Sequence, residues 1–293
     1  MKIKIIADAV SNLFKDILKE KQLDIRVLPV HLYFNDKDYL CYEELDDVKE
    51  FSKTYYQAMK DGADIRTSLV SPGEYEEAFL EEIKKGNKVI CFTMAKGISG
   101  TYNSACLARD MVNEKYPEKM VEVIDCMTAG FGEGMQAIYA DELVKQGKSF
   151  EEIISMCEER KHFLRSDFVV DNIKYLLKTG RANKVLARFV RFLNIRVMLK
   201  RSESSKIAFA GTSLGKEKSI KSLAKTVIEN IDLEHPTTVY ITHCNCIEDA
   251  ESLKTQLEAA NIKDIEIYDY DVISGAHIGP DSLAVFYLAK EAY

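Results

Sequence analysis

Short apolar segments alternate with amphipathic segments along the first half of the chain. Residues 2–8, 88–95 and 121–126 are short and rich in apolar or β-branched side chains, which is typical of buried strands. Between them, the segment 45–62 places apolar residues at intervals of three and four, which is typical of one helix face, and a second helix is expected at 71–86. This alternation predicts an α/β fold whose mostly parallel sheet is covered by helices on both faces.

The helix predicted at residues 71–86 has clear signals at both of its ends. Ser71 is a suitable N-cap, Pro72 follows at the first helical position, and Gly86 comes directly after the last turn. The helix predicted at residues 45–62 ends in the same way, at Gly62.

The pattern changes after Leu164, where a second α/β or α+β unit is expected. We therefore expect an N-terminal domain at residues 1–160 and a C-terminal domain at residues 161–293. The length of 293 residues agrees with two domains of ordinary size. In the second domain, strands are expected at 206–213, 237–244 and 264–271, with helices at 216–231 and 248–261.

Composition narrows the class of protein. The net charge of −7 argues against general affinity for nucleic acid, and no stretch approaches the roughly 20 apolar residues of a membrane span. The seven cysteines are scattered and odd in number, so a disulfide framework is not expected. The N-terminus reads as a first strand without a secretory signal, which favours a cytoplasmic protein. A transient contact with a membrane surface is compatible with this interpretation.

Three polar junctions next to strands or glycines are candidates for chemistry. They lie around Thr67 and Ser68, around Ser99 in KGISGTYNSA, and around His277 in GAHIGPDSLAVF. The first two lie where a strand gives way to a helix, and ligands of open α/β sheets collect at the carboxyl ends of strands. Hydroxyls and backbone N–H groups at a helix start form an anion site. A simple helix cap is the alternative for the first junction, and a turn-stabilising role is the alternative for His277.

A nucleophilic role for Ser99 has weaker support. The Gly-x-Ser-x-Gly elbow is absent, because Gly97-Ile98-Ser99-Gly100 runs into Thr101. No carboxylate is marked by a motif as the group that would orient His277 as a base. An anion cradle fits better, although a Ser/His acyl-ester hydrolase stays open as an alternative.

Two further clusters have mainly structural interpretations. The segment THCNC supplies at most three metal ligands, so no metal site is expected there. A basic row on this acidic chain is either a solvated helix face or a docking surface for a partner or phosphate; its members are Lys174, Lys178, Arg181, Lys184, Arg188 and Arg191.

The whole chain resembles the DegV family of bacterial fatty-acid-binding proteins, the fatty-acid-binding subunits of bacterial fatty acid kinase. The resemblance rests on six motifs that occur in the family's order: ADAVSNL, RTSLVSP, GISGTYNSA, VIDC, YLLKTGRANK and HIGPDSLAVF. It implies a non-catalytic carrier that needs no cofactor and buries one long-chain fatty acid between its two domains. It also implies that the carrier presents the acid to a separate kinase, which forms an acyl phosphate for phospholipid synthesis.

The same resemblance implies the site residues. Its hydroxyl motifs map onto Thr67, Ser68 and the segment Ser99, Gly100 and Thr101, with His277 near the carboxylate. Two positions depart from the family pattern: Leu214 stands where many members have Arg, and Asp281 replaces a Gly. A carrier of another lipid or carboxylate, without a kinase, is the remaining alternative.

Overall fold

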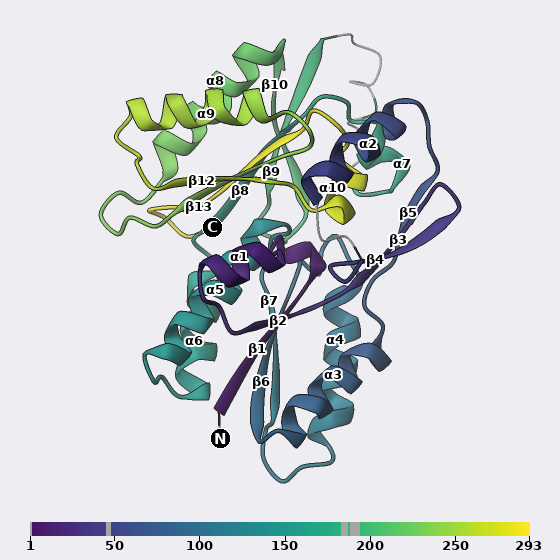
Figure 1. Cartoon of the computed structure of the whole chain (residues 1–293). Helices are drawn as coiled ribbons and strands as arrows, with labels where there is room; N and C mark the ends of the chain where they lie inside the picture. The colour runs from purple at the N-terminus through teal and green to yellow at the C-terminus, as the bar shows by residue number, and fades with distance from the viewer. Residues whose placement is uncertain (1, 45–47, 183–186, 188–193) are drawn as a thin grey trace. The chain divides into compact units, whose positions relative to one another are not determined.

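The computed structural model of the chain describes residues 2–44, 48–182, 187 and 194–293. These residues divide into two compact units (Figure 1). The first unit comprises residues 1–33, 37–46 and 67–162, and the second comprises 34–36, 47–66 and 163–293. The second unit thus includes a segment, 47–66, that lies well ahead of residue 160 in the sequence.

The first unit is built on a four-stranded parallel sheet in the order β2-β1-β6-β7. Helices α5 and α6 pack on one face of this sheet, and α3 and α4 pack together on the other (Figure 1). The α/β fold predicted from the alternating pattern is therefore confirmed. The strands are β1 (Lys2–Asp8), β2 (Ile25–Leu28), β6 (Asn87–Thr93) and β7 (Val121–Asp125). The helices are η1 (Ala9–Ser11), α1 (Lys15–Glu20), α3 (Pro72–Lys84), α4 (Thr101–Asn113), α5 (Phe131–Lys145) and α6 (Phe150–Arg160).

The sequence signals at the start of α3 have the expected structural effect. The Ser71 hydroxyl accepts a hydrogen bond from the backbone N–H of Glu74, and the Glu74 carboxylate accepts one from the N–H of Ser71. This capping box satisfies two amide groups that the helix itself cannot use. A separate three-stranded sheet, in the order β4-β3-β5, contains β3 (Val30–Phe34), β4 (Lys37–Cys41) and β5 (Ile65–Thr67).

The second unit is a six-stranded mixed sheet in the order β10-β9-β8-β13-β11-β12. Its only parallel pair among the described strands is β11 with β12, so the unit is α+β rather than doubly wound. The strands are β8 (Leu164–Val170), β9 (Ile195–Arg201), β10 (Ile207–Leu214), β11 (Val239–His243), β12 (Ile265–Asp269) and β13 (Leu283–Leu288). The helices are α2 (Val48–Lys60), α7 (Lys174–Lys178), α8 (Lys216–Asn230), α9 (Ile247–Ala259) and α10 (Val272–Ile278).

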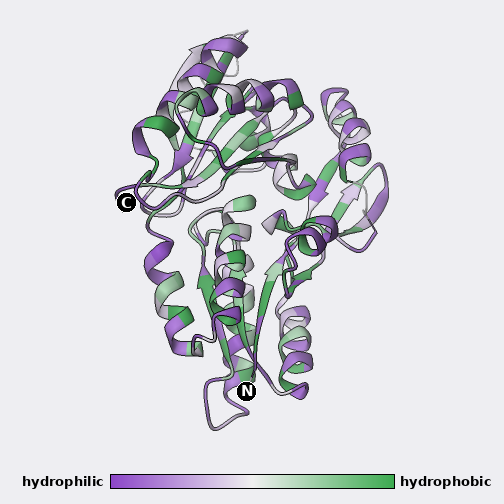
Figure 2. Ribbon diagram, turned by 60° about the vertical axis from the view of Figure 1, so that its left-hand side comes forward, coloured by the Kyte–Doolittle hydropathy of each residue, from purple (hydrophilic) through white to green (hydrophobic). Residues whose placement is uncertain are grey.

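Apolar residues are frequent in the strands, whereas the helices mix apolar and polar residues (Figure 2). In the second unit, Leu223 and Val227 of α8 and Leu253 and Leu257 of α9 pack against Val285 and its neighbours in the sheet. Across the described part of the chain, no helix combines the length and the apolar character that crossing a membrane would need.

Candidate functional site

The first candidate loop follows β5. Thr67 is the last residue of that strand, and the backbone N–H of Ser68 donates to the carbonyl of His31 at 3.0 Å. The Ser68 Oγ atom is shielded from solvent and has no hydrogen-bond partner among the described residues. A buried hydroxyl without a partner costs free energy, so it marks a position where a ligand atom would be stabilising.

The second candidate loop joins β6 to α4. The hydroxyls of Ser99 and Thr101 lie 2.9 Å apart, and the Thr101 N–H donates to Ser99 Oγ at 3.2 Å. Gly100, the N-cap of α4, has no side chain to cap the helix, so the loop opens directly onto the positive end of α4. Among the described residues of the first unit, Ser99 Oγ bonds to Thr101 and to no imidazole.

The structure brings these two loops together. Ser104, in the first turn of α4, donates from its Oγ to the carbonyl of Val70 at 2.6 Å. A Cβ atom built on Gly100 would lie 3.3 Å from Leu69 Cδ2. Thr67, Ser68, Ser99, Gly100 and Thr101 therefore belong to adjoining loops of one unit. Hydroxyls and amide groups so arranged can hold an anion such as a carboxylate without any formal cation.

A carboxylate at the end of β7 holds the Ser99 loop in place. Asp125 Oδ1 accepts from the backbone N–H of Lys96 at 3.3 Å and of Met127 at 2.9 Å. The N–H of Ala95 also donates to the carbonyl of Thr128 at 2.7 Å. Sequence reasoning noted Asp125 only as part of the VIDC motif and missed this supporting role, although an acid at a strand end was the available signal.

His277 lies in the second unit, on helix α10. Burial and the nearby positive charge of Arg181 lower the pKa of His277 to about 4. The imidazole is therefore neutral at pH 7, where it can donate one N–H but carries no charge. Because the other five predicted residues lie in the first unit, a ligand shared by His277 and the hydroxyl loops stays a prediction.

Two close packing contacts fix the backbone around His277. A Cβ atom on Gly275 would lie 2.0 Å from Tyr56 Oη, and one on Gly279 would lie 2.2 Å from Tyr175 Cδ2. Gly279 also has a positive φ of 85°. Only glycine fits at these positions, so the glycine-rich pattern has a packing origin as well as any role in binding.

The two departures from the family pattern have simple structural settings. Asp281 adopts a φ of 58°, which Asp tolerates, and its Oδ2 pairs with Lys60 Nζ at 2.6 Å. Leu214 ends β10 with 59% of its surface exposed.

Of the basic row, Lys184, Arg188 and Arg191 lie outside the described residues.

The THCNC segment is part of the packed second unit. Cys244 and Cys246 are buried, and the Cys246 thiol donates to the carbonyl of Ser282 at 3.3 Å. His243 Nδ1 faces Asp269 Oδ1 at 3.9 Å. Among the described residues, no group of three His, Cys, Asp or Glu side chains is placed to hold a metal ion.

A buried acid at the end of β1 was noted in the sequence only as part of a motif. Asp8 is 1% exposed; its Oδ1 accepts from the N–H of Val10 at 2.8 Å, and the Tyr75 hydroxyl approaches its Oδ2 at 3.4 Å. Burial raises the pKa of Asp8 to about 6, against the lowering effect of these two hydrogen bonds. The buried carboxyl group of Glu133 accepts from the Asp8 N–H at 3.2 Å.

Asp8→Asn is expected to make folding stability less dependent on pH. The folded form of the native chain holds the Asp8 proton up to about pH 6, whereas the unfolded chain loses it near 3.8. Stability contributed by this group is therefore present below about pH 4 and is lost as the pH rises through 6, by up to about 3 kcal/mol. Asparagine keeps the acceptor for Val10 but does not ionise.

Urea unfolding at several pH values between 4 and 7.5 measures this difference. The free energy of unfolding of Asp8→Asn, relative to that of the native chain, should increase as the pH rises. Glu20→Gln, an exposed change, should show the same pH dependence of the free energy of unfolding as the native chain. A constant difference between Asp8→Asn and the native chain across this range would contradict the assignment.

The fold is that of a two-unit protein, α/β in the first unit and α+β in the second, with two adjoining hydroxyl-bearing loops after β5 and β6 of the first unit. The sequence profile of the DegV family, described as an uncharacterised protein family, matches residues 2–290. A DegV domain-containing protein of Clostridium perfringens is 32% identical over 288 residues, which cover 98% of this chain and 97% of that protein. The chain belongs to the DegV family.

Solved structures show the same fold. A fatty acid binding DegV family protein from Streptococcus agalactiae superposes with a TM-score of 0.85 at 23% identity, covering 99% of this chain and 100% of that one. A DegV family protein from Thermus thermophilus, described for its fatty acid binding, gives a TM-score of 0.84 at 21% identity, over 99% and 100% of the two chains. A stearic acid-binding protein from Eubacterium ventriosum gives 0.81 at 24% identity, over 98% of each chain.

Proposed function

We propose that this protein is a non-catalytic carrier that binds one long-chain fatty acid. The carboxylate is held by the hydroxyl and amide groups of Thr67, Ser68 and Ser99–Thr101, with His277 as a further neutral donor. The observation that carries the proposal is the pair of adjoining hydroxyl loops, joined by the Ser104 contact to Val70, in a chain of the DegV family. Several proteins of the same fold are described with a named fatty acid: vaccenic acid, heptadecanoic acid and stearic acid.

The donor set suits a carboxylate that must later react. Hydroxyl and amide donors bind an anion with less energy than a bidentate arginine, so the head group keeps its reactivity and is released more readily. The low pKa of His277 agrees with this, because a neutral imidazole adds one hydrogen bond and no ion pair. Most of the affinity then comes from the acyl chain, at about 0.8 kcal/mol for each buried methylene.

The partner and the compartment are further parts of the proposal. The resemblance to subunits of fatty acid kinase supports presentation of the bound acid to a separate kinase, which phosphorylates its carboxylate. All seven cysteines are free thiols, which suits the reducing cytoplasm. A purified acyl kinase that forms acyl phosphate from ATP only in the presence of the loaded carrier would support this step.

Extraction of the purified, denatured protein with organic solvent, followed by mass spectrometry, tests the binding proposal. We expect one long-chain fatty acid for each folded chain. A folded protein that yields no lipid, and that takes up none from added palmitate, would overturn the carrier function. A different co-purifying lipid at full stoichiometry would select a carrier of another class.

A further inference from the structure

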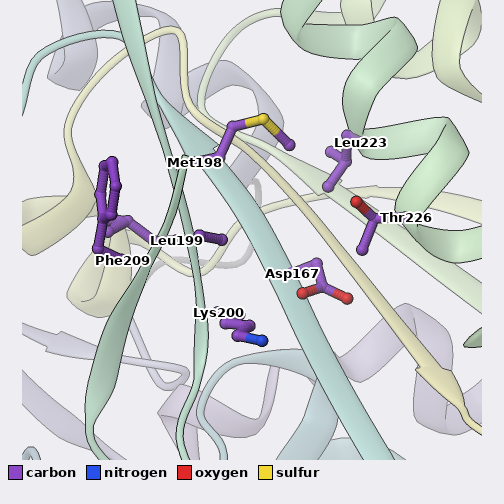
Figure 3. Close-up of a pocket in the computed structure, with 8 residues that line it drawn as sticks. Asp167, Met198, Leu199, Lys200, Phe209, Leu223 and Thr226 are labelled. Atoms are coloured by element: carbon purple, nitrogen blue, oxygen red, sulfur yellow. The ribbon is translucent and has the colours of Figure 1, made fainter. Parts of the chain in front are cut away.

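The second unit contains a cavity that the proposed carrier function does not use. Its volume is ≈ 240 Å³, and it lies between the β8-β9-β10 edge of the sheet and helix α8 (Figure 3). For scale, an engineered apolar cavity of about 150 Å³ is large enough to bind benzene. Its walls combine apolar and polar side chains, principally Asp167, Met198, Lys200, Phe209, Leu223 and Thr226.

Asp167 presents an unused acceptor to this cavity. The residue is 5% exposed, and its Oδ2 accepts a 2.7 Å hydrogen bond from the Tyr287 hydroxyl. Its other oxygen, Oδ1, has no hydrogen-bond partner among the described residues, and the carboxyl group borders the cavity (Figure 3). Oδ1 is not fully shielded, so it faces solvent through the cavity, where a ligand donor would take the place of water.

A second acceptor is available on the helical wall. The Thr226 hydroxyl donates to the carbonyl of Ser222, one turn earlier in α8, at 3.1 Å. Its single proton is thereby engaged, so toward the cavity Thr226 Oγ1 can act only as an acceptor. Two acceptors, one of them a carboxylate, match the donor-rich head of a primary ammonium group.

Lys200 supplies the opposite charge at the same cavity. It pairs with Asp167 in the register of β8 and β9, so both side chains stand on the same face of the sheet. Lys200 is exposed and forms no ion pair with Asp167 or any other described carboxylate. The two charged side chains are therefore neighbours that form no ion pair, and both line the cavity.

We propose that this cavity binds a free α-amino acid with an apolar side chain. The ammonium group bonds to Asp167 Oδ1 and Thr226 Oγ1, and the carboxylate faces Lys200 Nζ. The apolar side chain packs against Met198 and Leu223. A zwitterion fits this pair of charged side chains. A simple amine would place its positive charge near that of Lys200, and a simple acid would place its negative charge near that of Asp167.

This site goes beyond the fatty acid carrier function and does not depend on it. All of its residues lie in the second unit, and none is a predicted fatty acid contact. Binding here can therefore be measured whether or not lipid is present.

Isothermal titration of the intact protein with L-leucine and L-phenylalanine tests the proposal. We expect saturable binding of one molecule per chain, with a dissociation constant on the order of 1 mM or tighter. Asp167→Asn, which keeps an acceptor for Tyr287, should weaken binding about tenfold or more, because hydrogen bonds to charged groups are the stronger ones. Lys200→Gln should weaken it several-fold, and Lys263→Gln, an exposed change outside the cavity, should leave it unchanged.

Matched ligands separate the two halves of the site. Isoamylamine and 4-methylpentanoate lack the carboxylate and the ammonium group of leucine, respectively, and both should bind more weakly than leucine. The proposal is overturned if neither amino acid binds, if the amine or the acid binds as well as leucine, or if Lys200→Gln and Asp167→Asn both bind like the native protein. Lys200→Gln keeps the test decisive if Asp167→Asn does not fold.

Discussion

A variant that combines Thr67→Ala and Ser99→Ala is expected to fold normally and to lose its bound fatty acid. Each hydroxyl is proposed to donate one hydrogen bond to the carboxylate, and bonds to charged groups contribute about 1.5–3 kcal/mol each. Losing both should weaken binding by about 100- to 10,000-fold. Extraction and mass spectrometry of the purified variant, together with its thermal melting curve, measure the result.

The matched control removes two hydroxyls that play no part in the proposed site. Thr255 is exposed and Ser222 is half-buried, and both donate only to carbonyls one turn earlier in their helices. The variant with both changed to alanine should keep its full complement of lipid. If the Thr67/Ser99 variant also keeps it, the hydroxyls do not hold the carboxylate, even though the carrier function itself would stand.

Much of the first unit could be predicted because local signals decide it. The Ser71 cap, Pro72 and Gly86 predict the helix at 71–86, which the structure places at Pro72–Lys84 as α3. The buried strand expected at 88–95 is observed as Asn87–Thr93. Their alternation along the chain was enough to predict the parallel sheet.

The second unit was less predictable because its arrangement depends on distant residues. The helical period of 45–62 shows which face of α2 is apolar, yet the sequence alone does not say that α2 belongs to the second unit. The sequence of 272–293 predicts no particular element, whereas the structure forms α10 and β13 there, with β13 pairing between β8 and β11. Strand pairing over more than a hundred residues leaves no periodic local signal.

In the candidate site, too, some features could be predicted from local sequence and others depend on distant residues. The hydroxyl loops were predictable, because Ser and Thr beside glycine at strand ends form a short-range pattern. The role of Asp125 as the support of the Ser99 loop depends on β6 and β7 being neighbours. The packing of Gly275 against Tyr56 joins positions far apart in the sequence, so no local motif could indicate it.

Gly275→Ala is expected to destabilise the protein by about 3 kcal/mol or more. The new Cβ atom would lie 2.0 Å from Tyr56 Oη and 2.9 Å from Tyr56 Cζ, and the Tyr56 ring is fully buried. Neither the helix backbone nor the ring has open space to move into, so the clash must be relieved by a larger shift in the second unit. Urea unfolding measures the change in the free energy of unfolding.

A double-mutant cycle identifies the clash as the cause. Tyr56→Phe removes the atom that the Cβ would meet most closely, so Gly275→Ala should cost at least about 1 kcal/mol less in that background. Gly73→Ala is the matched control, because nothing lies within 4 Å of its Cβ position and its φ is not in the left-handed region. Alanine there should be neutral or stabilising by up to about 1 kcal/mol. Equal costs for Gly275→Ala with and without the Tyr56 hydroxyl would mean that the hydroxyl contact is not what makes glycine necessary at this position, and would leave the Tyr56 ring carbons at 2.9 and 3.1 Å as the atoms that exclude a Cβ.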